Sequence, residues 1–393
     1  MGEPWLAIIG LGEDGLAGLP DASRDALARA EVVFGGQRHL DLVQAGTRGQ
    51  PWLVPFDTAP VLALRGRRVA VLASGDPFWF GAGGSLAADL TPADWVAHPA
   101  PSTFALAAAR LGWRLEEVTC LGLHAQPLPR ARPHLTQGTR QICLMRDGAA
   151  VAEFAAYLCA LDLGPSTLTI LERLGGAQER IRQTTAAAAP LVGIAAPVAV
   201  AVEVAGGKGL PRGFGLPDDL FAHDGQITRA AVRAITLAAL SPRPGARLWD
   251  IGAGSGSVSV EWCLAGGAAY AIEPCTTRLA NIATNAAAFG VDHRMVVLHG
   301  AAPKIVGSLP PPNAVFLGGG CSEAVLQTVW QAMPDGARLV ANAVTLETEA
   351  LLAVWHAARG GTLLRIELAE ATPLGPKRGW TPGRPIVQWS VTR

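Results

Sequence analysis

One run of residues in the second half of the chain, RLWDIGAGSGSVSVEW, constrains the fold more than any other segment. An apolar stretch from Leu248 to Ile251 leads into three closely spaced glycines and then directly into a helical pattern. Glycines suit such a turn because the backbone must bend tightly and let a ligand approach without an intervening Cβ. A strand, a glycine loop and a helix in this order predict a parallel α/β sheet whose first turn cradles a nucleoside cofactor.

The spacing of the glycines distinguishes between two classes of nucleoside cofactor. Gly252, Gly254 and Gly256 form the pattern GxGxG, and Ser257 stands where a dinucleotide-binding fingerprint has its third glycine. Asp250 lies at the end of the strand, where NAD-binding strands are usually apolar. We therefore predict S-adenosylmethionine as the cofactor, with an NAD-dependent oxidoreductase as the alternative.

Three further strand ends carry residues that suit the same site. The run AYAIE ends at Glu273, where a carboxylate accepts hydrogen bonds from both ribose hydroxyls of a bound nucleoside. The run MVVLHG leads into residues 300–302, where we expect a loop that flanks the adenine. The run AVFLGGG ends in residues 318–320, which we expect beside the methionine end of the cofactor and the substrate.

The whole chain is organised around a segment dense in Gly and Pro, GGKGLPRGFGLP. On both sides of it, short runs rich in Val, Ile and Leu alternate with longer Ala-rich helical patterns. This alternation predicts two α/β domains with mostly parallel sheets, and 393 residues suffice for two domains. We predict an N-terminal domain over residues 1–205, a linker over 206–216 and a C-terminal domain over 217–393.

Composition argues against several other classes of protein. The 32 Lys and Arg residues balance 32 Asp and Glu residues, so we expect no nucleic-acid partner. The longest uncharged apolar stretch, Ala186 to Val202, contains Pro190 and Pro197 and predicts a helix end followed by a buried strand, not a membrane span. The first ten residues lack the features of a signal peptide, so we expect a cytoplasmic protein without a membrane anchor. The six cysteines and eight histidines form no CxxC, HxxxH or HExxH pattern, and we expect no metal site.

The second half of the chain resembles a known family. From about Pro217 to the C-terminus, the run DGQITRAAVRAITLAALSPRPGARLWDIGAGSGSVSVEW, followed by AIEP, HGAAP, FLGGG and ANAVTLETE, is similar to the class I methyltransferases of cobalamin biosynthesis that methylate carbon 15 of precorrin-6Y and remove a carboxyl group from the acetate on carbon 12. The resemblance implies a Rossmann-like fold and cofactor contacts from Thr228, Gly252, Ala253, Gly254, Ser255, Gly256, Glu273 and Ala302. Ala301 stands where many methyltransferases carry an acid, so backbone atoms alone are expected to hold the adenine amino group.

The first half contains Gly10, Gly12 and Gly15, which formally satisfy GxGxxG. A dinucleotide fingerprint runs straight into a helix, whereas Gly18 and Pro20 interrupt this one before a helix that we expect over residues 21–30. The runs LAIIGLGEDGLAGLP, ASGDPFWFGAG, PAPSTFALAAARLGW and LTILERLGGAQERI instead resemble, in this order, segments of the tetrapyrrole methylase family. The resemblance implies two α/β subdomains with a cofactor cleft between them, lined by Gly10, Gly75, Asp76, Ser102 and Thr103.

Together the two resemblances imply a bifunctional enzyme with one S-adenosylmethionine per domain. The N-terminal domain would methylate carbon 5 of precorrin-6Y, and the C-terminal domain would methylate carbon 15 and decarboxylate the acetate on carbon 12, giving precorrin-8. The methyl donor is an activated sulfonium, so alignment matters more than a strong base and we predict no catalytic triad. Lys304, Lys377, Arg378 and Arg384 are candidates to bind the carboxylates of the substrate.

We expect a homo-oligomer. The alternative to two active domains is a chain in which one domain has lost catalysis and only presents the substrate to the other.

Overall fold

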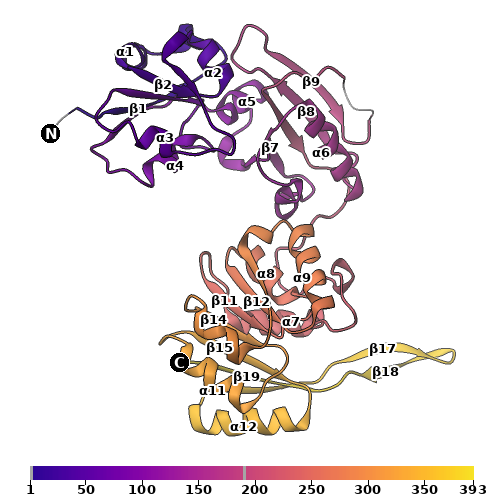
Figure 1. Cartoon of the computed structure of the whole chain (residues 1–393). Coiled ribbons are helices and arrows are strands. Elements are labelled where there is room, and N and C mark those ends of the chain that lie inside the picture. Colours follow the sequence, from indigo (N-terminus) through magenta and orange to yellow (C-terminus); the bar gives the residue numbers. More distant parts are fainter. Residues whose placement is uncertain (1–2, 189–191) are drawn as a thin grey trace. The chain divides into compact units, whose positions relative to one another are not determined.

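The computed structural model describes residues 3–188 and 192–393, and its chain divides into two compact units (Figure 1). Unit 1 comprises Met1–Leu128 and His134–Gly209, and unit 2 comprises Pro129–Pro133 and Leu210–Arg393. Pro190, one of the two prolines that argued against a membrane span, lies outside the described residues. Among the described residues, no helix has both the length and the apolar character needed to cross a membrane.

The first sheet of unit 1 is entirely parallel, in the strand order β3-β2-β4-β1-β5. Its strands are β1 (Leu6–Leu11), β2 (Val32–Gly35), β3 (Gly49–Pro51), β4 (Val69–Ser74) and β5 (Trp95–His98). The helices that accompany it are α1 (Asp21–Arg29), α2 (Gln37–Leu42), α3 (Ala59–Leu62) and α4 (Ala82–Ala87), with 3₁₀ turns at Gly15–Gly18 and Gly46–Arg48. The central strands β1 and β4 are almost wholly buried, which explains their continuous apolar runs.

The second sheet of unit 1 differs from the prediction of mostly parallel sheets. Its order is β6-β7-β10-β8-β9, and only β6 and β7 pair in parallel. Strands β7 and β8 run in the same direction, as expected of strands joined by a helix, but β10 inserts between them in the opposite direction. The strands are β6 (Val118–Gly122), β7 (Arg140–Met145), β8 (Thr167–Glu172), β9 (Arg180–Thr185) and β10 (Val198–Glu203), and the helices are α5 (Thr103–Leu111) and α6 (Gly148–Ala160), with 3₁₀ turns at Leu115–Glu117 and Leu128–His134.

The stretch from Ala186 to Val202 contains the predicted buried strand, which is β10. The helix end expected before that strand is wrong for the described residues, because β9 ends at Thr185, immediately before the stretch, and residues 186–188 form a turn. The residues just before the stretch form strand β9, which pairs antiparallel with β8, and they are therefore not helical.

Unit 2 contains a seven-stranded sheet in the order β13-β12-β11-β14-β15-β19-β16. The five strands from β13 to β15 are parallel, and β19 pairs antiparallel with both β15 and β16. The strands are β11 (Arg247–Ile251), β12 (Ala268–Glu273), β13 (Met295–His299), β14 (Ala314–Leu317), β15 (Arg338–Ala343), β16 (Thr362–Ile366) and β19 (Ile386–Thr392). The chain runs from β11 outward to β13 and then crosses back to β14, which pairs with β11 on its other side. The strand order therefore reverses between β11 and β14. Ligands of open parallel sheets bind at such a point, outside the carboxyl ends of the strands.

The helices of unit 2 pack on the two faces of this sheet and form two core clusters. One cluster centres on Trp249 and Trp389, and the other on Trp262 and Phe289. The helices are α7 (Ala230–Leu240), α8 (Ser257–Leu264), α9 (Thr276–Ala288), α10 (Ala302–Ile305), α11 (Glu323–Ala332) and α12 (Leu346–Arg359), with 3₁₀ turns at Asp218–Leu220, Asp292–Arg294 and Val306–Ser308. Strands β17 (Ala369–Leu374) and β18 (Lys377–Pro382) form a separate hairpin that projects from the rest of unit 2 (Figure 1).

The Gly- and Pro-rich segment between the halves is packed at both ends. The backbone N–H of Gly207 donates to the carbonyl of Asp162 at 2.8 Å, within unit 1. The N–H groups of Gly215 and Leu216 donate to the Glu261 carboxylate at 2.7 and 3.0 Å, within unit 2. The boundary between the units falls after Gly209, so residues from 210 onward are part of unit 2.

We predict that a fragment of residues 210–393 is more stable than one of residues 217–393. The shorter fragment lacks the Leu216 carbonyl, which accepts a hydrogen bond from the buried Arg233, and the two N–H donors to Glu261. Each buried polar group left without a partner costs about 1–3 kcal/mol. Both fragments lack residues 129–133, so their thermal unfolding midpoints report on residues 210–216 alone; equal midpoints would show that these contacts contribute nothing.

Candidate functional site

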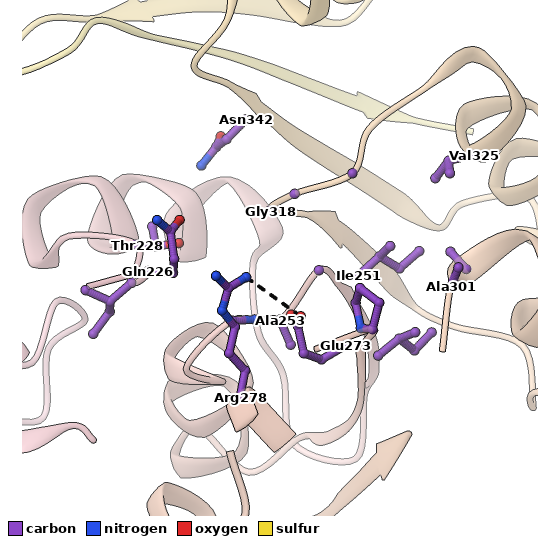
Figure 2. A pocket seen from close by; sticks show the side chains of 18 of the residues that line it. Gln226, Thr228, Ile251, Ala253, Glu273, Arg278, Ala301, Gly318, Val325 and Asn342 are labelled. Carbon is purple, nitrogen blue, oxygen red and sulfur yellow. Dashed lines mark hydrogen bonds and ion pairs between the residues drawn. The ribbon is translucent and has the colours of Figure 1, made fainter. Parts of the chain in front are cut away.

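A pocket of about 380 Å³ opens in unit 2 at the carboxyl ends of the parallel strands (Figure 2). This volume falls in the range of ~300–1,000 Å³ typical of small-molecule sites. The turns that follow β11, β12, β13 and β14 line the pocket, together with residues 226–229 before α7. In Figure 2, Gln226 and Thr228 lie on one side and Ala301 and Val325 on the other, with Glu273 between them.

The glycine loop after β11 adopts a backbone that favours glycine at three positions. Gly252, Gly254 and Gly256 have φ values of 69°, 59° and 72°. A Cβ on Gly252 would lie 2.7 Å from the carbonyl oxygen of Gly319, and one on Gly254 would lie 3.1 Å from that of Gln226. The loop therefore packs backbone against backbone with the turn after β14 and with the segment before α7.

Glu273 lies at the end of β12 with its carboxylate fixed beside the glycine loop. Its side chain is almost fully buried, one carboxylate oxygen accepts from the N–H of Gly254 at 2.8 Å, and the other accepts from the N–H of Cys275 at 3.0 Å. The Arg278 guanidinium is 3.9 Å from the second oxygen (Figure 2). This geometry holds the carboxylate at the pocket wall, where it can accept hydrogen bonds from a sugar.

Arg278 lines the pocket and was not predicted from the sequence. Its Nε donates to Asp224 at 2.9 Å, and this hydrogen bond raises the pKa of Arg278 and lowers that of Asp224. The signal that could have found it is its place in the first turn of α9, directly after the strand that ends at Glu273.

Asp250 supports the loop from behind and does not line the pocket. It is 1% exposed, and one carboxylate oxygen accepts from the Ser259 hydroxyl at 2.6 Å and from the Ser259 N–H at 3.2 Å. Burial raises the pKa of Asp250 to about 6. This acid at the strand end ties the start of α8 to β11.

The structure brings most of the predicted cofactor residues of unit 2 together. Those that line the pocket are Thr228, Gly252, Ala253, Gly254, Glu273 and Ala302. Ser255 and Gly256 lie behind it: Ser255 is 2% exposed, and a Cβ on Gly256 would meet Ile282 at 2.9 Å. The turn of residues 318–320 lines the pocket, as does the turn of residues 300–302.

The four predicted substrate-binding cations are not among the residues that line the pocket. Lys304 is on α10, next to the lining residue Pro303, and Arg384 lies two residues before the lining residue Ile386. Lys377 and Arg378 begin β18, near the tip of the projecting hairpin. Sequence alone could not place them, because the hairpin leaves the sheet between β16 and β19.

In unit 1, the end of β1 and two loops meet at the carboxyl end of the first sheet. A Cβ on Gly10 would lie 2.0 Å from the carbonyl oxygen of Gly75 and 2.5 Å from the nitrogen of Ala100. Gly75 has a φ of 58°, and a Cβ there would lie 2.8 Å from the carbonyl oxygen of Pro101 and from the Cα of Ser102. The end of β1, which contains Gly10, the loop after β4 and the segment before α5 thus pack backbone to backbone.

The remaining predicted residues of unit 1 shape these turns. Asp76 accepts a hydrogen bond from the N–H of Phe78 at 2.8 Å. Ser102 caps α5 by accepting from the N–H of Ala105 at 3.1 Å, and Thr103 is the first residue of that helix. A Cβ on Gly176, which follows the last residues of β8, would lie 2.6 Å from the Cβ of Glu13, so the opening turn faces the second sheet.

A polar cluster beside these turns was not predicted. Arg38 donates to Glu13 and, at 3.0 Å, to the Ser74 hydroxyl, which is 2.9 Å from His39 Nε2. Burial and the neighbouring Arg38 charge lower the pKa of His39 to about 4, so this imidazole is neutral at physiological pH. Among the described residues of both units, no group of three or more His, Cys, Asp or Glu side chains is placed to hold a metal ion.

Comparison with known proteins finds a family for each half of the chain. The profile of the precorrin methyltransferase domain matches residues 219–393, and that of the tetrapyrrole (corrin/porphyrin) methylases matches residues 6–190.

Relatives match the chain over its whole length and over part of it. A Sinorhizobium sp protein named precorrin-6Y C(5,15)-methyltransferase [decarboxylating] is 47% identical over 401 residues, which cover 99% of this chain and 97% of the relative. A protein of the same name from Mycobacterium tuberculosis (strain CDC 1551 / Oshkosh) is 39% identical and covers 99% and 100%. A Pyrobaculum calidifontis protein named probable cobalt-precorrin-6B C(15)-methyltransferase (decarboxylating) is 39% identical over 141 residues, or 34% of this chain and 72% of the relative.

Proposed function

The chain belongs to the family of precorrin-6Y C5,15-methyltransferases (decarboxylating), and we propose that it methylates precorrin-6Y at carbons 5 and 15 and decarboxylates the acetate on carbon 12, giving precorrin-8. The observation that carries the proposal is the pocket of unit 2, in which a glycine loop and the strand-end carboxylate of Glu273 face the same space. Family membership also favours a methyltransferase over the NAD-dependent alternative.

We assign the two methylations to separate domains. The N-terminal domain, residues 1–205, would act at carbon 5, and the C-terminal domain, residues 217–393, would act at carbon 15 and decarboxylate. The tetrapyrrole methylase profile covers residues 6–190, and the precorrin methyltransferase profile covers residues 219–393. The Pyrobaculum relative, named for the carbon-15 step alone, corresponds to only 34% of this chain. The ranges of the two profiles and the short match to the Pyrobaculum relative both support one reaction, and one S-adenosylmethionine, per domain.

The residues of the unit 2 pocket fit this cofactor. Gly254 lines the pocket with its backbone, which lies against the segment before α7 because no Cβ intervenes. Glu273 presents its carboxylate at the same wall for the ribose hydroxyls. The turn of residues 318–320 adds three glycines on the β14 side, where a bulky substrate can approach. When bound, S-adenosylmethionine supplies the activated methyl group, so the protein's task is to align it with the nucleophilic carbon and exclude water.

Substrate carboxylates require cations near this pocket. We propose Lys304 and Arg384 for that role, because Lys304 follows the lining residue Pro303 and Arg384 lies two residues before the lining residue Ile386. Lys377 and Arg378 would contact a substrate only where it reaches the hairpin. We propose that the chain has no nucleic-acid partner, because positive and negative charges balance in its composition. The cytoplasmic location and the homo-oligomer stay proposals.

Counting transferred methyl groups tests the function directly. The full chain is incubated with precorrin-6Y and S-adenosylmethionine labelled in the methyl group, and the product is analysed by mass spectrometry. We expect two labels per product and loss of one carboxyl group. A single label would instead support a chain in which one domain only presents the substrate.

We predict that Glu273→Ala weakens cofactor binding at the unit 2 site by ~10- to 100-fold, taking charge-assisted hydrogen bonds at roughly 1.5–3 kcal/mol. Titration calorimetry of the full chain with S-adenosylhomocysteine measures the loss as weakening of one class of sites. Glu273→Gln is the matched variant, because it keeps the shape and one acceptor oxygen, while it removes the charge and puts a donor nitrogen in place of the second acceptor. An unchanged affinity in Glu273→Ala would contradict the ribose-binding role.

A further inference from the structure

A fully buried arginine lies behind the pocket of unit 2. Arg233, on α7, has no exposed surface. Its Nε donates to Glu261 at 2.5 Å, and its Nη1 donates to Asp218 at 3.0 Å and to the carbonyl of Thr228. Its Nη2 donates to the carbonyl of Leu216. One guanidinium therefore connects α8, the segment that enters unit 2, and the residues that precede α7.

The surroundings of Arg233 fix its position. Its guanidinium carbon lies 4.8 Å from the centre of the Phe221 ring, and its two carboxylate partners compensate the buried charge. Glu261 also accepts the N–H groups of Gly215 and Leu216, so residues 215–218 are fastened to α7 and α8 through this one ion-pair network.

The same network reaches the pocket wall. Residues 226–229 line the pocket, and the Thr228 carbonyl that accepts from Arg233 belongs to that wall. The Gln226 carbonyl oxygen would lie 3.1 Å from a Cβ on Gly254, so the wall rests against the glycine loop. Because Arg233 bonds to the wall on one side and to residues 216 and 218 on the other, displacement of either segment is transmitted to the other.

We propose that Arg233 is a positioning residue of the cofactor pocket, which holds residues 226–229 against the glycine loop and makes cofactor affinity depend on the segment 215–218. This inference rests on the proposed function, in which the pocket binds S-adenosylmethionine. It assigns to the segment that joins the two halves of the chain a part in building the unit 2 site, beyond that of a spacer.

The test compares two destabilising variants of the full chain. Arg233→Met removes the network, and Leu352→Ala removes an equally buried side chain on α12 that does not line the pocket. We expect both to lower the unfolding midpoint. At a temperature where both remain folded, we expect only Arg233→Met to weaken binding of S-adenosylhomocysteine at the unit 2 site, by about tenfold or more, since a small displacement of a binding wall has effects of that size.

Gly254→Val is expected to bind S-adenosylhomocysteine at the unit 1 site alone. The binding that it shows is therefore subtracted from that of each other variant, which leaves the binding at the unit 2 site. If the wild-type chain shows no binding beyond that of Gly254→Val, the proposed function fails. If the wild type binds and Arg233→Met binds as tightly, the positioning role fails while the proposed function stands. Should Arg233→Met not fold, Asp218→Ala, which removes the acceptor of the Arg233 Nη1 hydrogen bond and keeps the Glu261 pair, decides: a severalfold weaker affinity supports the role and an unchanged one overturns it.

Discussion

We expect Gly254→Val to abolish methylation at carbon 15 and the release of carbon dioxide, while methylation at carbon 5 continues. Gly254 has a φ of 59°, where a branched residue is strained, and its N–H is the donor to Glu273. A valine side chain would also enter the space beside the Gln226 carbonyl, where the cofactor is proposed to lie. We expect the carbon-15 rate to fall by at least about 100-fold, the size of effect that misplaced reactants produce.

Mass spectrometry of the product distinguishes the outcomes. From precorrin-6Y, Gly254→Val should give a species that is one methyl group heavier and retains its carboxyl group. Gly336→Val is the matched control: Gly336 is in unit 2, has a φ of 82°, and has no atom within 4 Å of a Cβ. It therefore imposes similar backbone strain away from the pocket. Carbon dioxide release at the normal rate by Gly254→Val would mean that the decarboxylation belongs to the other half of the chain.

The unit 2 site was largely predictable because its parts are local in sequence. Each strand end and the turn that follows it are adjacent in the chain, so the run DIGAGSG and the end of AYAIE identify the loop and Glu273 directly. Parallel strands then bring these turns to one edge of the sheet without further information. The strand–helix alternation predicted the folds of unit 2 and of the first sheet of unit 1 for the same reason.

What the sequence did not reveal depends on pairing between distant segments. The apolar run of β10 predicts a buried strand, but apolarity does not encode strand direction, and its insertion between β7 and β8 makes the second sheet mostly antiparallel. Arg233 and Arg278 were not among the residues predicted from the sequence. Only the fold shows that one is wholly buried and that the other lines the pocket.

We expect the opposite lesion, Gly75→Val in unit 1, to stop methylation at carbon 5 and to leave carbon dioxide release intact. A Cβ on Gly75 would lie 2.8 Å from backbone atoms of Pro101 and Ser102, and backbone cannot move aside as a flexible side chain can. The turn after β4 would then separate from the segment before α5, and we expect at least about a 100-fold lower carbon-5 rate.

A milder variant and a control separate loss of the site from loss of the fold. Asp76→Ala removes only the hydrogen bond to the Phe78 N–H and should lower the carbon-5 rate less than Gly75→Val does. Gly66→Val places the same side chain at a φ of 94° in an open turn of unit 1 and should leave both reactions unchanged. Compared with precorrin-6Y, the expected product of Gly75→Val has gained one methyl group, at carbon 15, and has lost one carboxyl group. If carbon dioxide release instead disappears together with carbon-5 methylation, the unit 2 reaction requires the product of unit 1, and the two sites act in a fixed order on one substrate.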